Sequence, residues 1–154
     1  MRRRFLLLMA LALTGCSLGT GPEEDDGLLG IIRVVTSAEL QIIVPKTVHA
    51  GEQFEVTVRT YGLDSCWSMG ETEVSAAGAS ATVSPFDIPG RPTATTGCYA
   101  AIVEFNHTAS IRFDTPGTGT VIVRGRDLVQ DRTVRIERPV AVAGESPRMR
   151  GRSE

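Results

Sequence analysis

The sequence predicts an all-β domain, a single sandwich of about seven or eight strands. Residues 53–61 alternate strictly, with Phe54, Val56 and Val58 apolar and the residues between them polar. This period of two is typical of a strand with one buried face and one solvent-exposed face. Turn signals such as Thr115-Pro116-Gly117 recur at short intervals, and no stretch beyond the first 15 residues shows a helical period. Short strands without helices favour two packed sheets.

The first strands are expected in two apolar stretches, Leu28–Val35 and Ala38–Val44. Pro45 follows the second and should end it or place it at an edge, because proline lacks the amide hydrogen that a ladder needs. A turn is expected at His49–Glu52, before the alternating strand Gln53–Tyr61. Gly62–Gly70 is then predicted to be a loop that carries Cys66 and Trp67.

The middle of the chain predicts two short strands, Glu71–Ser75 and Ala79–Ser84, and then a long irregular connection, Pro85–Gly97. Cys98–Asn106 is expected to be a strand with Tyr99, Val103 and Phe105 on one face. The remaining predicted strands are Ala109–Asp114, Thr120–Arg124 and Arg132–Val142, with a loop at Gly125–Asp131. The domain therefore spans residues 28–143, and residues 144–154 are expected to form a disordered tail because they lack an apolar period.

The first 15 residues are predicted to be a signal peptide. Arg2, Arg3 and Arg4 precede an apolar run that is about nine residues long, too short for the roughly 20 residues of a membrane span. Leu13-Thr14-Gly15-Cys16 follows and resembles the lipobox of bacterial lipoproteins. The resemblance implies diacylglycerol transfer to the Cys16 sulfur, cleavage before Cys16 and acylation of the new amino terminus by a fatty acid such as palmitate. The alternatives are an ordinary signal peptide and, given the paired arginines, a twin-arginine signal.

Residues 16–27 are expected to be a lipidated, acidic and flexible tether. The segment contains Glu23-Glu24-Asp25-Asp26 and one large apolar residue, Leu18, so it has too little apolar surface to pack. Two or more acyl chains give lasting attachment, whereas one binds only marginally. The expected location is the cell envelope, on the outer membrane if the cell has one, because Ser17 does not resemble a retention signal.

The charge of the chain is mildly acidic. The 154 residues carry 16 Lys and Arg against 18 Asp and Glu, a net charge of -2, and removal of the signal makes the mature chain more acidic still. A nucleic-acid-binding domain would instead show a basic patch. The expected partners are therefore the membrane, through the anchor, and an envelope protein or glycan, with no nucleic acid.

Cys66 and Cys98 remain after Cys16 is assigned to the anchor. An even pair in an exported chain predicts a disulfide, which would stabilise the fold by about 3–4 kcal/mol in the chain-entropy model. The alternatives are two free thiols and a metal pair. Free thiols do not suit an oxidising compartment, and the Cys-x-x-Cys spacing of a metal site is absent from the sequence.

Two segments resemble bacterial immunoglobulin-like domains. Pro45 through Gly51-Glu52 into the Gln53–Arg59 strand is similar to their opening, and Phe113–Gly117 followed by Thr120–Gly125 is similar to their late hairpin. The resemblance covers about Ala38 to Val142 and implies an immunoglobulin-like sandwich without a functional signature. One departure is clear, because immunoglobulin domains proper place their cysteines on opposing core strands. Here Cys66 and Cys98 are expected to hold the proline-rich connection.

The sequence offers no catalytic residue. Its two histidines, His49 and His107, fall in predicted turns, and the Gly-x-Ser-x-Gly elbow of hydrolases is absent. A blue-copper site would need two His, a Cys and usually a Met, and the disulfide would consume Cys98. No phosphate-binding loop or EF-hand occurs in the sequence, so no metal or other cofactor is expected.

Trp67 and Tyr99 are the candidate ligand contacts. Trp67 either covers the disulfide or serves as an exposed aromatic contact, of the kind that often anchors interfaces. The sequence favours a non-enzymatic lipoprotein with a structural or protein-binding role, acting through the loops Gly62–Gly70 and Pro85–Gly97. The alternative is a glycan-binding module that uses Trp67 and Tyr99. A Trp67 ring exposed in a rigid, flat setting would favour this alternative.

Overall fold

The computed structural model describes residues 27–37, 40–93, 95 and 97–144, which form ten strands and no helix. The strands are β1 (Leu28–Leu29), β2 (Ile31–Arg33), β3 (Ile42–Ile43), β4 (Thr47–His49), β5 (Gln53–Gly62), β6 (Ser68–Ala77), β7 (Ser80–Ile88), β8 (Val103–Arg112), β9 (Gly117–Asp127) and β10 (Arg132–Ala143). The predicted signal peptide, Cys16, the tether up to residue 26 and residues 145–154 of the predicted tail lie outside the described residues.

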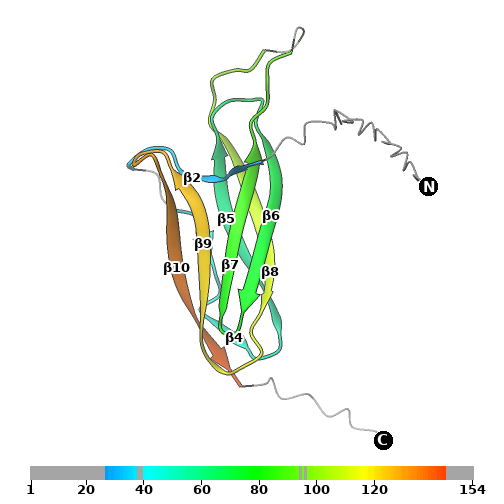
Figure 1. The fold of residues 1–154 in the computed structure, drawn as a ribbon, viewed down its shortest axis with the longest axis vertical. Helices are drawn as coiled ribbons and strands as arrows, with labels where there is room; N and C mark the ends of the chain where they lie inside the picture. Colours follow the sequence, from blue (N-terminus) through cyan, green and yellow to red (C-terminus); the bar gives the residue numbers. More distant parts are fainter. Residues whose placement is uncertain (1–26, 38–39, 94, 96, 145–154) are drawn as a thin grey trace, which may run out of the picture.

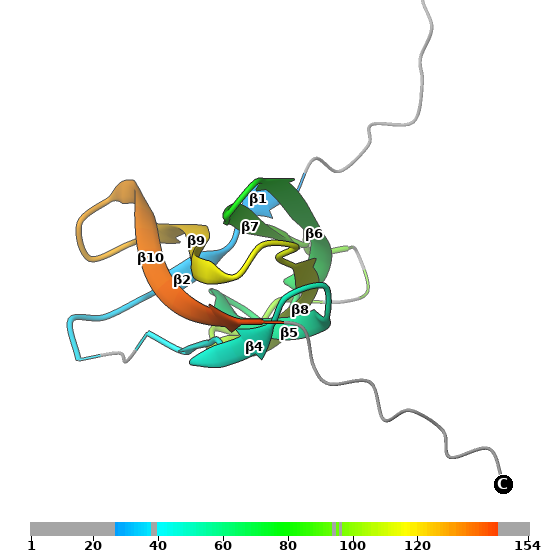
Figure 2. The ribbon, with the colours of Figure 1, turned by 90° about the horizontal axis from the view of Figure 1, so that it is seen from below.

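The strands fold into two layers, as the sequence predicts. One layer has the order β6-β7-β9-β10 and continues into β4, and the other consists of β8, β5 and β3 (Figures 1 and 2). β2 pairs with both β5 and β9, so it joins the layers at one corner. β7 and β9 run parallel, whereas the β6-β7 and β9-β10 pairs are antiparallel. The strand count exceeds the expected seven or eight because residues 28–49 form four short strands.

The alternation in β5 and β8 places their apolar side chains in the core. Val56 and Val58 are fully buried, and Ile111 and Phe113 are nearly so. The ring of Phe54 lies 5.5 Å from that of Phe113, measured between centroids. The inward-facing residues that the sequence predicts for these strands are therefore confirmed.

Strands β6 and β7 are longer than the predicted Glu71–Ser75 and Ala79–Ser84. β7 continues through Pro85 to Ile88, where an irregular connection was expected. The pairing of β6 with β7 shifts register between Met69 and Thr72, and proline is tolerated in a sheet at such an irregularity. The Pro85 carbonyl also accepts a hydrogen bond from the Gly30 amide at 2.8 Å, so this part of β7 stays in the sheet.

Other predicted boundaries also change. β8 is a single strand that begins at Val103, so the predicted strand Cys98–Asn106 is wrong over its first five residues. Tyr99 therefore lies in a loop, and its side chain is exposed. β3 is shorter than the predicted Ala38–Val44. β9 continues to Asp127, because residues 125–127 pair with β10 and residues 126–127 also pair with β2. The predicted loop Gly125–Asp131 is therefore shorter than expected.

His107 does not lie in a turn. It occupies the middle of β8 with its side chain only 1% exposed. The polar run Asn106-His107-Thr108 interrupts the apolar alternation, which is why the sequence predicts a break at this point. The strand continues because His107 faces inward and finds hydrogen-bonding partners there.

Candidate binding surface at the disulfide end

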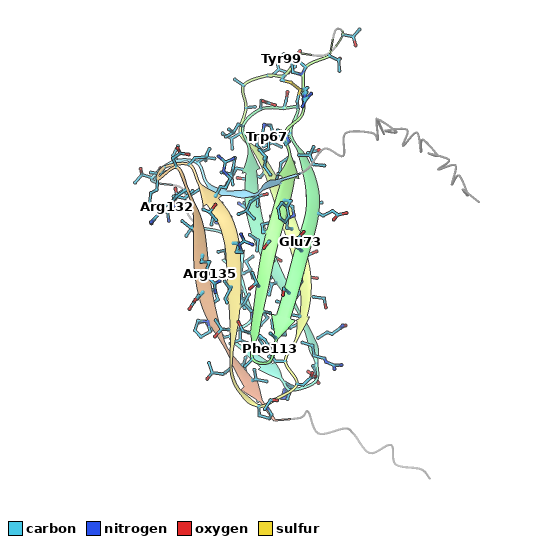
Figure 3. All side chains as sticks on the ribbon, in the orientation of Figure 1. Trp67, Glu73, Tyr99, Phe113, Arg132 and Arg135 are labelled. Atoms are coloured by element: carbon cyan, nitrogen blue, oxygen red, sulfur yellow. A yellow bond between two sulfur atoms is a disulfide. The ribbon has the colours of Figure 1, made fainter. Side chains whose placement is uncertain are left out.

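The predicted disulfide is present between Cys66 and Cys98. It joins the loop after β5 to the loop before β8 across a sequence separation of 32 residues, with the two Cα atoms 5.3 Å apart. Both cysteines are half-buried and neither lies on a core strand. The bond therefore ties two loops at one end of the sandwich, the end at which Figure 3 labels Tyr99.

Hydrogen bonds reinforce the disulfide. The Ser65 amide donates to the Tyr99 carbonyl at 3.0 Å, and the Tyr99 amide donates to Ser65 Oγ at 2.8 Å. The Cys66 amide donates to Asp64 Oδ1 at 2.8 Å, which closes a local turn. Because these bonds use backbone groups on both loops, the position of Tyr99 is fixed by its neighbours on the first loop.

Two glycines allow the loops to pack closely. A Cβ at Gly90 would overlap the backbone carbonyl of Cys66, so only glycine lets the proline-rich connection pass this close to the disulfide. A Cβ at Gly62 would lie 2.5 Å from Cβ of Trp67. Trp67 is half-buried, so its side chain packs against the end of β5 and is not a flat exposed surface.

Large apolar side chains are exposed at this end of the molecule. Tyr99 is 77% exposed, Ile102 55%, Met69 53% and Leu63 41%. They lie on three segments that meet here: the loop after β5, the start of β6 and the segment before β8. Scattered single apolar residues are ordinary on a surface, but several at one rigid end are typical of a contact site.

A buried polar cluster lies between the layers, below this end. His107 Nε2 is 2.9 Å from Asp87 Oδ1, and His107 Nδ1 is 2.8 Å from Thr72 Oγ1. The side chains of His107 and Asp87 are 1% and 0% exposed. Because a carboxylate oxygen only accepts hydrogen bonds, Nε2 donates to Asp87, and Nδ1 is paired with the Thr72 hydroxyl. The cluster links β6, β7 and β8.

This cluster consists of residue types found in hydrolytic triads, yet it does not form a catalytic arrangement. Such a triad needs a hydroxyl that can reach a substrate carbonyl, with the histidine between that hydroxyl and an acid. Here the histidine is enclosed by two layers of strands, so no substrate reaches its ring. The sequence prediction missed the cluster, because Thr72, Asp87 and His107 are far apart in the chain and the fold alone brings them together.

Two further polar atoms are buried close to the cluster. Asp87 Oδ2 and Thr60 Oγ1 have no hydrogen-bond partner among the described residues. Gly30, between β1 and β2, lies directly against these two side chains. A Cβ at this position would lie 3.1 Å from Asp87 Oδ2 and 2.5 Å from Cγ2 of Thr60, so only glycine lets the backbone pass this close. Buried polar groups therefore lie here beside buried apolar residues such as Ile31 and Tyr61.

The acidic and sulfur groups at the disulfide end do not form a metal site. Asp64, Cys66 and Cys98 place potential ligand atoms within 4.8 Å of one another, but both sulfur atoms are bonded to each other. Metal-binding cysteines act as thiolates, which a disulfide removes. The copper alternative fails for the same reason at Cys98, and His107 is already engaged with Asp87.

A groove of about 880 Å³ with a mixed polar and apolar lining lies on the outer face of the β6-β7-β9-β10 layer. Its walls include Glu73 from β6, Arg124 from β9 and Arg135 from β10, together with Ser and Thr hydroxyls. The sequence prediction did not identify this surface. The alternating polar positions of these strands are the signal that could have found it, once their order in the sheet is known.

Comparisons with protein-family models, with curated proteins and with solved structures found no match to this chain. Within the described residues, no helix is long and apolar enough to cross a membrane.

Proposed function

We propose that this chain is a non-enzymatic, lipid-anchored lipoprotein of the bacterial cell envelope, with an immunoglobulin-like sandwich that has a structural or protein-binding role. Two features support the proposal. Leu13-Thr14-Gly15-Cys16 resembles a lipobox behind a charged and apolar leader. The Cys66–Cys98 disulfide suits an exported chain, because disulfides persist in oxidising compartments. On this proposal the outer membrane is the location in a cell that has one.

The exposed apolar residues at the disulfide end support a protein partner most directly. Tyr99 is 77% exposed although its backbone is hydrogen-bonded to Ser65 on the neighbouring loop. An aromatic side chain on a fixed backbone loses little conformational entropy on binding, because it has only two rotatable angles, and tyrosine is enriched among residues that dominate interface energies. Ile102, Met69 and Leu63 are also exposed, on the segments that meet at this end of the sandwich. The proposed contact surface consists of these four residues.

The anchor is tested by the intact mass of the chain extracted from membranes. We expect residues 16–154 plus the mass of two or three acyl chains, with two thiols that react with an alkylating reagent only after reduction. The Cys16→Ser variant should lose the acyl mass and leave the membrane fraction while keeping its disulfide. An unmodified mass for the original chain, or cleavage at another residue, would refute the lipoprotein assignment.

The contact surface is tested by crosslinking in intact cells. A photoreactive amino acid at Tyr99 or Ile102 should give a discrete crosslinked band with one envelope protein. The same amino acid at Glu55, which is exposed on β5 in the other layer, serves as the matched control and should not give that band. Equal crosslinking from all three positions would show that the disulfide end is not a specific contact site.

A glycan-binding role is the second candidate, and the exposed Tyr99 ring favours it. The half-buried Trp67 packs against Gly62 and so does not add a second stacking surface. The test is cosedimentation of the protein with isolated cell-wall polysaccharide. If Tyr99→Ala abolishes binding to the polysaccharide and Glu55→Ala does not, the glycan role replaces the protein-binding role.

A further inference from the structure

The outer face of the β6-β7-β9-β10 layer carries one continuous row of side chains across all four strands. Glu73 on β6 lies opposite Ser84 on β7. Val83 on β7 is aligned with Val123 on β9, which sets Ser84 beside Arg124. Arg124 in turn lies opposite Arg135 on β10. The row therefore begins with an acid on the edge strand β6 and ends with one arginine on β9 and one on the edge strand β10; Figure 3 labels Glu73 and Arg135 at its two ends.

Both edges of this layer are free of strand partners over much of their length. Among the described strands, β6 pairs only with β7, and β10 pairs only with β9 until Ala141, where its pairing with β4 begins. Free edges carry unpaired backbone amide and carbonyl groups, and natural proteins often protect them with proline, lysine or bulges. β6 has an irregularity near its first residues, but its sequence contains no proline and no lysine. The free part of β10 has one proline, Pro139, near its end, so residues 132–138 are the part open to pairing.

Among the described residues, the charges of this row have no close partner of opposite sign. Arg124 and Arg135 stand directly opposite each other, an arrangement that destabilises a pair of strands. The nearest carboxylate to Arg135 is that of Glu137, at 4.0 Å. Within the described part of the chain, neither Glu73 nor Arg124 forms a salt bridge. An acidic group placed beside Arg135 would therefore relieve an existing repulsion.

The strand directions allow a second copy to supply that acid. β6 is antiparallel to β7, β10 is antiparallel to β9, and β7 and β9 are parallel, so β6 and β10 run in the same direction. A second molecule shifted sideways in the plane of the layer, without being turned over, would bring its β6 beside β10 of the first as a parallel pair. The same shift extends the row, so Glu73 of the second copy would stand next to Arg135 of the first.

We propose that copies of this chain associate edge to edge, with β6 of one molecule pairing in parallel with the free part of β10 of the next. The backbone groups of the two edges supply the hydrogen bonds, and the Glu73–Arg135 pair supplies the register. The two edges are different surfaces, so each molecule keeps one free edge of each kind after it binds. Such a head-to-tail contact does not close on itself and produces open chains of molecules. This edge-to-edge contact does not require the proposed anchor.

The test measures self-association of the full-length chain carrying Cys16→Ser, by sedimentation velocity over a range of protein concentrations at low salt. The mean mass should rise continuously with concentration, without stopping at a dimer. Glu73→Arg alone and Arg135→Glu alone should each weaken association by about tenfold, because each places like charges at the contact. Glu55→Arg makes the same change of charge on the other layer and should associate like the parent.

Two combinations distinguish a direct contact from a general charge effect. The double variant Glu73→Arg with Arg135→Glu has its charges exchanged and should recover association. An equimolar mixture of the two single variants should also associate, because each contact in an alternating chain then joins opposite charges. Circular dichroism and thermal melting should show that all variants are folded, as expected for exposed positions. A parent chain that stays monomeric, or single variants that associate like the parent, would overturn the proposal.

Discussion

At the scale of single residues, the pair Asp87–His107 is the most consequential interaction of the core. Both side chains are fully enclosed, and their 2.9 Å hydrogen bond joins the two layers of the sandwich. A buried polar group without a partner costs more free energy than a satisfied hydrogen bond contributes. The two residues are therefore expected to tolerate joint replacement better than the loss of either one.

We expect His107→Leu to lower the free energy of unfolding by about 3–5 kcal/mol, because it leaves the carboxyl group of Asp87 buried without its partner. Chemical denaturation measures this loss. Asp87→Leu should also destabilise, and the double variant should lose clearly less than the two single losses combined. Thr108→Ala, at the exposed neighbouring position, should change stability by less than about 0.5 kcal/mol. Fully additive losses would mean that the pair is not coupled.

At the scale of elements, strands with regular alternation are predictable and the others are not. β5 and β10 match their predicted ranges closely, since each alternates over most of its length. The sequence predicts a break in β8 at the buried His107. The partner of this histidine, Asp87, lies in another strand, so the alternation within β8 gives no sign of it. β7 was cut short at Pro85, because the register shift that accommodates the proline belongs to the pairing with β6.

The loops of the disulfide end give a prediction at this same scale. Gly90→Ala should destabilise the domain by about 1–3 kcal/mol, because the new methyl group meets the backbone of Cys66 and forces the connection outward. Gly97→Ala is the matched control in the same connection, since a Cβ there meets no atom within 4 Å. Thermal melting of both variants compares them directly. Equal effects would show that the loop adapts without cost.

At the scale of the whole molecule, the sequence was sufficient for the fold class and for one covalent link. The sandwich follows from alternation and turn signals, and the disulfide follows from the even pair of cysteines that remains once Cys16 is assigned to the predicted anchor. The buried cluster and the row of charges from Glu73 to Arg135 depend on strand order and register. Those are fixed by packing between segments far apart in the chain, so no local pattern reveals them.

The direction of the last strand has a mechanical consequence. The described chain enters beside β7 near the disulfide end, with Leu28 opposite Asp87, and β10 leaves at the other end of the sandwich (Figure 1). Tension applied between these two points pulls β10 along its own axis, past β9 and β4. Its eleven paired positions with β9 would then carry the load together rather than opening one after another. At the other loading point β1 is held to β7 through only two paired positions, so the end of the sandwich at β10 is the more strongly held of the two.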